Sequence, residues 1–510
     1  MSKKQSLPTK WSKVSLTEIT ELIRGVTYKK SDSADTQASG LVPILRATNI
    51  QDNQLLLESA LVYVPASNVS EKQILHSGDV VVCLSSGSKH LVGKTAISHF
   101  DWQGSFGAFC GVIRSDTGVS SSYVGYYLQS PEYKSFISSK ASGVNINNLR
   151  RSDFDELIIP VAAKNEQDRI VIKIDELFSQ INEGNRSLKK VEANLKRYRA
   201  SILKDACEGK LVPTEAELAK KEGRGYEHAG LLLERILKER KVTWEKESPG
   251  KKYKEPKVPD TSNLSELPEG WVWTSMGQVF NVHVGSTPSR AVENYWGGDI
   301  PWVSSGAVSF CRIKDTKEKI TKLGFENSST TIHPTGTILV GMIGEGKTRG
   351  QVAILDIKAT HNQNSAAIRV SDTEVIPEYI YYYLFGKYEE TRRTSSGNNQ
   401  PALNRTRVME INFPLPPIKE QIRIVEEIEK QETNIVKGFD MLKYYFISQN
   451  ILKQSILKKA FAGKLVPQNP DDEPASTLLK KIKEERAKRE LEAKVEKKKK
   501  PTKKIKKKTS

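Results

Sequence analysis

Apolar residues recur at alternating intervals of four and three positions along two segments of the chain, with polar residues between them. This spacing predicts a helix with a narrow hydrophobic stripe, suited to packing against one partner helix. The stripes begin near Glu166 and Glu420, and each predicted helix is about 39 residues, or roughly 58 Å, long. The predicted seam positions are Ile170, Ile174, Leu177, Ile181, Leu188 and Leu195 in the first helix and Ile424, Ile428, Ile435, Leu442, Leu452 and Ile456 in the second.

The two predicted helices are copies of one sequence. SILKDACEGKLVP starts at Ser201 and recurs as SILKKAFAGKLVP at Ser455, which lies 254 residues later. The motif Glu-Gln-x-Arg-Ile-Val recurs with the same separation, and Leu-Pro-x-x-Trp opens both halves, at Leu7 and Leu267. A separation held over this length means that one structural unit was built twice.

A glycine lies near the middle of each seam, at Gly184 and Gly438. Glycine in a helix interior costs up to about 1 kcal/mol relative to alanine, so its presence in both copies asks for a reason. In a fully overlapped antiparallel pair the two glycines would meet at the crossing point. Shared ancestry with no present role is the alternative. At the helix ends, Gly209 and Gly463 follow the last apolar turn and predict the two C-termini.

A shorter helix is predicted after each long one. The two copies match at Leu232, Leu233 and Ile236 in the first and at Leu478, Leu479 and Ile482 in the second. Exposed apolar residues on these short helices are candidates for docking another subunit.

The segments between the shared parts differ in sequence and read as mixed α/β domains. Strands are predicted at residues 80–83, 95–97, 337–340 and 351–355, and short helical segments at 124–128 and 379–384. Duplicated halves tend to pack around a pseudo-two-fold axis, which would make the long helices antiparallel. The predicted fold is therefore α+β, with two mixed α/β domains separated by two long helices in an antiparallel coiled coil. The predicted domains are 1–160 and 265–415 for the variable domains, 161–215 and 416–468 for the long helices, 216–264 for a short helix and charged linker, and 469–510 for a short helix and a disordered lysine-rich tail.

The net charge of +18 is concentrated at the C-terminus, because residues 497–510 carry nine lysines and no acid. A lysine run of this kind adds salt-dependent attraction to DNA without specifying a sequence. No stretch approaches the roughly 18 apolar residues of a membrane span, and no signal peptide is visible, so the chain is predicted to be cytoplasmic. The four cysteines are scattered and predicted to be reduced, and no metal site is expected.

One motif points toward a different function. Residues 341–348 read GMIGEGKT and satisfy the phosphate-loop pattern G-x-x-x-x-G-K-T. A nucleotide-binding loop must open a helix whose N-terminal amides hold the phosphate. Residues 349–355 read instead as another strand, and the first half lacks the pattern. We therefore predict a hairpin tip with Lys347 or Arg349 available to a phosphate. No methyltransferase or glycine-rich cofactor motif is visible, so the chain is predicted to be non-catalytic.

These motifs, in this order, resemble the specificity (S) subunit of type I restriction-modification systems. The resemblance rests on the Leu-Pro-x-x-Trp openings, on the prolines that precede Glu-Gln-x-Arg-Ile at Pro160 and Pro416, and on the Gly-Lys-Leu-Val-Pro ends. It covers nearly the whole chain, and the lysine tail is the part that departs from it. It implies two target-recognition domains, each reading half of a bipartite DNA site, and a coiled coil that sets the gap.

The resemblance also implies partners for a role in host defence. The chain would bind double-stranded DNA and two methyltransferase (M) subunits and recruit restriction (R) subunits. S-adenosylmethionine is expected on M and ATP on R, and this chain is expected to bind no cofactor.

Reading bases by hydrogen bonds requires arginine, lysine, asparagine or glutamine at base edges, with phosphate contacts setting the register. Polar residues in the predicted loops are the candidates for this task. They are Arg46, Asn49, Lys89, His90, Lys94 and Asn145 in the first half, and Arg290, Lys347, Arg349, Asn362, Gln363, Asn364, Asn398 and Arg405 in the second.

Two other classes of protein stay open. A coiled-coil scaffold without DNA affinity explains the helices but gives the two divergent domains no task. A phosphate-loop NTPase requires nucleotide binding that Lys347→Ala abolishes. The DNA target itself is not readable, because base choice depends on loop geometry.

Overall fold

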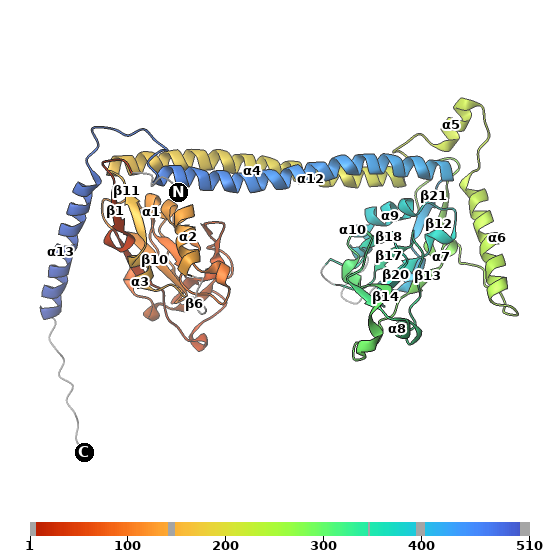
Figure 1. Ribbon diagram of the computed structural model, residues 1–510, viewed down its shortest axis with the longest axis horizontal. Coiled ribbons are helices and arrows are strands. Elements are labelled where there is room, and N and C mark those ends of the chain that lie inside the picture. The colour runs from red at the N-terminus through yellow and green to blue at the C-terminus, as the bar shows by residue number, and fades with distance from the viewer. Residues whose placement is uncertain (1–6, 141–147, 345–346, 394–402, 500–510) are drawn as a thin grey trace, which may run out of the picture. The chain divides into compact units, whose positions relative to one another are not determined.

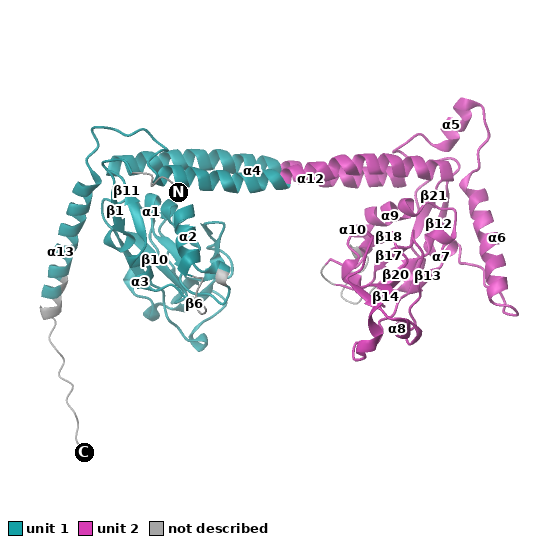
Figure 2. Ribbon diagram, in the orientation of Figure 1, with its two compact units in different colours: residues 1–188, 443–510 teal, residues 189–442 magenta. Residues whose placement is uncertain are grey.

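The chain forms two compact units (Figure 2). Unit 1 comprises residues 1–188 and 443–510, and unit 2 comprises residues 189–442. Each unit therefore contains one variable domain and a segment of each long helix. The computed structural model describes residues 7–140, 148–344, 347–393 and 403–499.

Unit 1 contains a four-stranded antiparallel sheet in the order β2-β10-β7-β8. Its strand β10 is labelled in Figure 1. The predicted strand at 80–83 is β7 (Val80–Cys83), and all of its residues are buried. Val80 and Val82 contact one hydrophobic cluster and Val81 contacts another, because successive strand side chains point to opposite faces. Smaller sheets have the orders β6-β3-β9, β4-β5 and β1-β11. The other strands are β1 (Ser12–Ser15), β2 (Thr20–Arg24), β3 (Leu41–Leu45), β4 (Ile50–Gln51), β5 (Gln54–Leu55), β6 (Val62–Pro65), β8 (Thr95–Ile97), β9 (Ser105–Phe106), β10 (Cys110–Ser115) and β11 (Ile158–Val161), and the helices are α1 (Ser121–Tyr127), α2 (Pro131–Lys140) and α3 (Arg151–Asp155).

Unit 2 repeats this plan with a five-stranded sheet in the order β13-β20-β17-β18-β15. The predicted strands at 337–340 and 351–355 are β17 (Ile338–Gly341) and β18 (Val352–Leu355), so each prediction is displaced by one residue at one end or both. The second sheet has the order β16-β14-β19, and β12 pairs with β21. The other elements are β12 (Val272–Ser275), β13 (Val282–Val284), β14 (Trp296–Val303), β15 (Cys311–Ile313), β16 (Glu318–Ile320), β19 (Thr360–His361), β20 (Ser365–Ile368), β21 (Asn412–Leu415), α7 (Met276–Val279), α8 (Lys322–Glu326), α9 (Pro377–Gly386), α10 (Tyr388–Arg393) and α11 (Arg405–Met409).

The two long helices are α4 (Lys164–Cys207) and α12 (Ile418–Phe461), and each has 44 residues. They are longer than predicted because each begins two residues before the Glu-Gln motif and also extends further at its C-terminal end, to Cys207 or Phe461. As predicted, Gly209 and Gly463 follow the C-termini of the two helices, and their φ of 67° is left-handed. The amide that follows each glycine donates to a carbonyl five residues back, at 2.8 and 2.9 Å, which closes the helix end. The mixed α+β class is confirmed.

Segments of α4 and α12 lie antiparallel within each unit. In unit 2 the Tyr198 hydroxyl contacts the Gln431 carbonyl oxygen at 3.0 Å, and Arg199 pairs with Glu432 at 2.7 Å. In unit 1 the Lys453 ammonium donates to Asn182 at 2.8 Å. Among the predicted seam residues, Ile170, Ile174, Ile181, Ile424, Ile428, Ile435, Leu442 and Ile456 are buried, and Leu177, Leu188 and Leu195 are half-buried.

Leu452 departs from the predicted seam, because 46% of its surface is exposed. Lys453 faces α4 in this part of the helix, where its ammonium lies 5.4 Å from the centre of the Phe178 ring. A seam that steps by 3.5 residues drifts around a helix that has 3.6 residues per turn. The drift has carried Leu452 out of the contact.

The prediction that the two seam glycines meet is wrong. A Cβ built on Gly438 lies 2.9 Å from the Leu195 side chain, so Gly438 packs against leucine. Leu195 follows Gly184 by about three helical turns, or roughly 16 Å. A Cβ at Gly184 would have nothing within 4 Å.

Gly184→Ala is expected to stabilise the chain by about 0.5–1 kcal/mol, because alanine loses less backbone entropy in a helix and has open space here. Urea unfolding followed by circular dichroism measures the change. Gly438→Ala is the matched control, since its Cβ crowds Leu195 and offsets the same entropic gain. Equal gains from both variants would contradict the packing difference.

The Glu-Gln motif joins each long helix to the opening of the half in the same unit. The Glu166 carboxylate accepts a hydrogen bond from the Trp11 indole at 2.9 Å, and Glu420 accepts one from Trp271 at 3.0 Å. Burial raises the pKa of Glu420, and the hydrogen bonds from Glu215 and Trp271 oppose that shift. The repeated motifs therefore build the same buried joint twice.

The glutamine of the motif satisfies two backbone groups at once. Gln167 accepts from the Ser120 amide and donates to the Ala162 carbonyl, both at 2.9 Å. Gln421 makes the equivalent pair of bonds in unit 2. A glutamine with both ends bonded fixes the angle between the helix and the domain, because an unpaired buried amide is costly.

The short helices α6 (Ala229–Glu247) and α13 (Ala475–Lys499) fold back onto their own units, and α5 (Glu215–Glu222) precedes α6. Leu232 and Ile236 are buried in the core of unit 2, and Ile482 is buried in that of unit 1. These three residues are not free to dock another subunit, because the chain covers them itself. Other apolar residues of the same helices are exposed, among them Leu231 at 45% and Leu491 at 64%.

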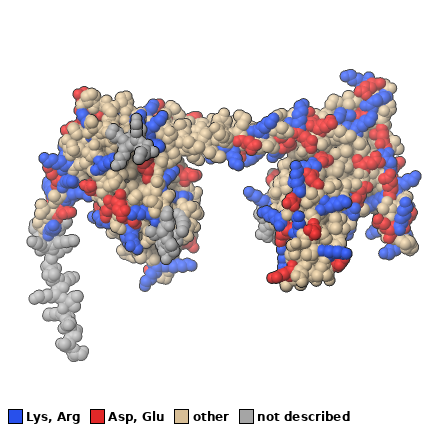
Figure 3. Space-filling view, in the orientation of Figure 1, with Lys and Arg blue, Asp and Glu red and all other residues tan. Residues whose placement is uncertain are grey.

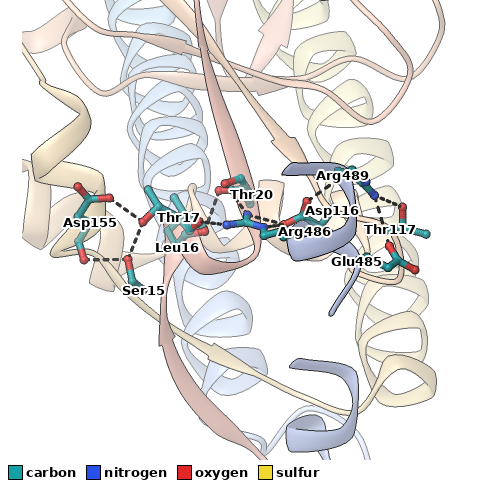
Figure 4. A network of polar contacts seen from close by, with 10 residues as sticks. All are labelled: Ser15, Leu16, Thr17, Thr20, Asp116, Thr117, Asp155, Glu485, Arg486 and Arg489. Carbon is teal, nitrogen blue, oxygen red and sulfur yellow. Dashed lines mark hydrogen bonds and ion pairs between the residues drawn. The ribbon is translucent and has the colours of Figure 1, made fainter. Parts of the chain in front are cut away.

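Arg486 holds α13 against the first variable domain (Figure 4). Its guanidinium donates to the carbonyls of Thr17 and Thr20, at 2.8 and 3.1 Å, and pairs with Asp116 at 2.5 Å. In unit 2 the equivalent Arg240 donates to two backbone carbonyls of α7, at 2.8 Å each. Each domain is thus fixed both to a long helix and to a short one. Residues 500–510, part of the predicted lysine tail, lie outside the described residues.

Candidate nucleic-acid interface

Both units bring the same three loops together at one end of the main sheet. We call this the loop end: residues 25–26, 84–94 and 107–109 in unit 1, and 285–287, 342–344, 347–351 and 362–364 in unit 2. Matching hydrogen bonds define the equivalence. The Val26 amide donates to Phe106 at 2.7 Å, and the Ser286 amide donates to His361 at 3.0 Å. Two different sets of side chains therefore stand on one backbone frame.

A glycine makes the close approach at each loop end possible. A Cβ built on Gly25 would lie 2.1 Å from the carbonyl oxygen of Gly107, and one on Gly285 would lie 2.0 Å from that of His361. Both obstacles are backbone atoms, so they do not rotate away. Gly25 and Gly285 therefore allow the first loop to pass in close contact with the turn before β10 or β20.

The loop end of unit 1 carries three of the predicted residues. His90 and Lys94 are exposed on the β7–β8 connection, and Lys89 begins a short 3-10 turn there. The Lys94 carbonyl accepts from the Cys83 amide at 2.9 Å, which fixes the start of β8. His90 and Lys94 therefore present polar side chains to solvent at this loop end.

Asn49 is a structural residue, and its prediction as a base contact is wrong. It is 1% exposed, and its amide donates to the carbonyls of Leu56 and Ser59 at 2.9 and 2.7 Å. Its side-chain oxygen accepts from the Arg46 amide, so no group is left for a base. Arg46 is exposed and gives one N–H to the Ala60 carbonyl at 2.8 Å.

The phosphate-loop pattern of unit 2 lies in a hairpin. The Gly341 amide donates to Gln351 and the Gly350 amide to Gly341, both at 2.8 Å, so the chain returns directly from β17 to β18. Among the described residues of this turn none is helical, which confirms the strand predicted after the motif. Lys347 is exposed at the tip and Arg349 is half-buried.

The turn between β19 and β20 separates one structural asparagine from exposed polar groups. Asn362 is 7% exposed, and its side-chain oxygen accepts from the Asn364 amide at 3.2 Å. Its prediction as a base contact is therefore wrong. Gln363 is exposed, and its carbonyl oxygen accepts from the Thr287 hydroxyl at 2.5 Å. Asn364 is half-buried.

Arg290 stacks on two tryptophans that the sequence analysis did not identify. Its guanidinium carbon lies 3.7 Å from the centre of the Trp296 ring and 5.1 Å from that of Trp302. It also pairs with Glu318, and this hydrogen bond raises the pKa of Arg290 and lowers that of the carboxyl. The stack holds one face of the cation, as cation–π contacts do.

The remaining candidates are Arg405, Asn145 and Asn398. Arg405 begins α11, and its Nε donates to the Val282 carbonyl at 2.8 Å. Asn145 and Asn398 lie outside the described residues.

Three histidines meet in unit 2, although the sequence shows no cluster. The His333 ring lies 5.4 Å from that of His283 and 5.0 Å from that of His361. Burial, with the neighbouring histidines, lowers the pKa of His333 to about 3 and that of His361 to about 4. Within the described parts of the chain, no group of three or more His, Cys, Asp or Glu side chains is placed to hold a metal ion. His333 and His361 are therefore buried and neutral, whereas His283 is half-buried.

Charges of both signs are interspersed on the face of each unit that Figure 3 shows. Two of the candidate cations are accompanied by polar partners, since Arg290 pairs with Glu318 and Arg46 donates to the Ala60 carbonyl. A surface of this kind relies on individually placed side chains for recognition. None of the described helices has the length and apolar character needed to cross a membrane.

Comparison with known proteins gives consistent matches over most of the chain. Residues 8–193 and 268–438 match the family model described as type I restriction modification DNA specificity domain. The specificity subunit of the type I restriction enzyme StySPI from Salmonella potsdam is 27% identical over 498 residues, and the alignment covers 94% of this chain and 96% of that one. The EcoKI specificity subunit from Escherichia coli K12 is 29% identical over 499 residues, with the same coverage of both chains.

A solved structure shares the fold. It comes from work described as the structural basis underlying complex assembly and conformational transition of the type I R-M system. The TM-score is 0.64 at 17% identity, and the match covers 90% of this chain and 100% of that one.

Proposed function

The chain belongs to the family of the type I restriction modification DNA specificity domain, and from this premise we propose that it selects the DNA site on which a type I restriction-modification complex acts. Each variable domain reads one half of a bipartite, gapped sequence. The chain contributes recognition, and the partner subunits contribute catalysis.

One observation carries this proposal: a single backbone frame presents two different sets of side chains. The turn before β10 carries Ala108 and Phe109, whereas the equivalent turn before β20 carries Gln363 and Asn364. The hairpins differ as well. Binding residues are commonly placed on loops that a rigid scaffold positions, and differing side chains at equivalent places read different bases.

The experiment is methylome sequencing of cells with and without this chain, co-expressed with the methyltransferase of its system. A gapped motif that depends on the chain is expected, and exchanging residues 1–160 should change one half of that motif only. An unchanged methylome with an active methyltransferase would overturn the proposal and favour a scaffold without DNA affinity.

We further propose that methyltransferase subunits, which hold S-adenosylmethionine, dock on the long helices, and that restriction subunits, which use ATP, join that assembly. In unit 1, α12 carries Tyr444, Ile447 and Ile451 at 70, 53 and 64% exposure. The corresponding stretch of helix shows few charges in Figure 3. Several exposed apolar side chains along one face of a helix are typical of an interaction site.

Ile451→Glu is expected to abolish co-purification of the methyltransferase, because it places a charge in the apolar stripe. Leu491→Glu is the control, since Leu491 is also 64% exposed but lies on α13. Size-exclusion chromatography of the co-expressed subunits measures the effect. Retention of the partner by the Ile451 variant would contradict this placement.

Lys347→Ala is expected to weaken binding to all DNA sequences equally and to reduce the salt slope of log affinity by about 1, as the loss of one phosphate contact does. Lys221→Ala on α5 is the control, since Lys221 is also exposed. Salt titration of duplex binding measures the slope. Loss of nucleotide binding in the Lys347 variant would instead favour an NTPase.

A further inference from the structure

A large aromatic side chain stands at the loop end of unit 1 where unit 2 has polar ones. Phe109 is 68% exposed in the turn between β9 and β10. Its carbonyl accepts from the Leu84 amide at 2.9 Å, and the Asn364 carbonyl accepts from the Met342 amide at 2.8 Å. These matching bonds place Phe109 at the position that Asn364 occupies in unit 2.

The backbone of this turn is held on both sides. The Phe109 carbonyl accepts a second bond, from the Ser85 amide at 3.1 Å, and the Cys110 amide donates to Gly107 at 2.8 Å. The turn is therefore fixed while its side chain stays in solvent. Burying a phenylalanine would contribute about 1.5–3 kcal/mol, and this position gains little of that from the fold of unit 1.

The surroundings of Phe109 are those of a DNA-facing loop. Ser85 pairs with Asn148 in an isolated bridge, which brings a third segment to the same place. His90 and Lys94 are exposed on the neighbouring hairpin. An apolar ring among polar and cationic groups has a specific use on DNA, because thymine alone presents a methyl group at its major-groove edge.

We propose that Phe109 is a specificity-determining residue, and that its ring packs against the C5 methyl of a thymine in the half-site read by unit 1. This inference rests on the proposed function of the chain. It adds a contact of a different kind from the hydrogen bonds expected of Gln363 in unit 2.

The test uses the complex of the full chain with its methyltransferase and duplexes in which each thymine of that half-site is replaced in turn by deoxyuridine. One replacement is expected to weaken wild-type binding about four-fold, the effect of one buried methyl group. Phe109→Ala is expected to bind the thymine duplex about four-fold more weakly and to be indifferent to the replacement. Phe109→Leu, which stays apolar, should retain the preference for thymine.

Phe100→Ala is the matched control. Phe100 is 53% exposed in the same unit, but it follows β8 at the opposite end of the strand from the hairpin. This variant should keep the wild-type response to deoxyuridine. Fluorescence anisotropy measures each affinity at one fixed salt concentration.

The outcomes separate this inference from the proposed function. A complex that binds no duplex selectively contradicts the proposed function. A selective wild-type complex that tolerates deoxyuridine at every thymine, or whose half-site holds no thymine, overturns the role of Phe109. A Phe109→Ala complex that still prefers thymine overturns it too. Equal losses on both duplexes without a methyl effect would show a wedge between bases instead.

Discussion

Gly285→Ala is expected to destabilise the second variable domain by about 3 kcal/mol or more and to abolish recognition of one half-site. The new Cβ would lie 2.0 Å from the His361 carbonyl oxygen and 2.5 Å from its carbon. Backbone atoms cannot rotate away, so the loop must shift and lose the 3.0 Å hydrogen bond from Ser286 to His361. Hydrogen exchange of the intact chain, read by mass spectrometry, should show faster exchange in β13 and β20.

Two glycine variants complete this experiment. Gly25→Ala should transfer the damage to unit 1, because its Cβ would lie 2.1 Å from the Gly107 carbonyl oxygen. Gly306→Ala should be harmless, since the nearest atom to its Cβ is the Ser304 hydroxyl at 3.9 Å. Wild-type exchange rates in the Gly285 variant would show that the loop does not require this close approach.

Acid is expected to destabilise unit 2 far more than unit 1, because unit 2 buries neutral histidines. His333 is 0% and His361 1% exposed, and in the folded chain their pKa values are lowered to about 3 and about 4. The unfolded chain, with pKa values near 6.5, binds more protons below that pH. The contribution of these two histidines to the free energy of unfolding is therefore fully present above about pH 6.5, and it falls as the pH decreases toward the folded pKa values. At pH 5 the loss is about 2 kcal/mol for each histidine.

Urea unfolding at pH 7 and pH 5, followed by tryptophan fluorescence, measures this loss. Five of the seven tryptophans belong to unit 2, so the signal reports mainly on that unit. His333→Phe keeps a ring of similar size and should remove about 2 kcal/mol of the acid sensitivity. The exposed His228, changed to glutamine, is the control. Equal acid sensitivity of wild type and His333→Phe would refute the burial of a neutral ring.

The elements of secondary structure were largely predictable because their signals are local. The glycines at Gly209 and Gly463 ended both long helices, and the all-apolar run of β7 formed the buried strand expected of it. Turn chemistry and hydrophobic periodicity act within a few residues, so they survive in one sequence without any partner. The duplicated motifs also indicated the family, because their order in both halves can be read from the sequence alone.

The candidate interface was predictable only in outline. Asn49 and Asn362 have the same chemistry as Asn364, and the sequence offers no reason to separate them. The fold buries the first two and bonds their side-chain amides, whereas Gln363, the chain neighbour of Asn362, is exposed. Phe109 was not among the predicted candidates, because a phenylalanine is normally assigned to the core.

Contacts between residues that are distant in the sequence account for the buried joints, the packing of the seam glycine and the histidine cluster, which local patterns did not predict. Trp11 and Glu166 are separated by 155 positions and form a buried hydrogen bond. Gly438 packs against Leu195, and not against Gly184 as predicted. The three histidines come together from separate strands and loops. Periodicity and turn residues determine where helices and strands begin and end, since those forces act along the chain. Exposure, hydrogen-bond partners and pKa values depend on which segments meet after folding, and only the tertiary structure contains that information.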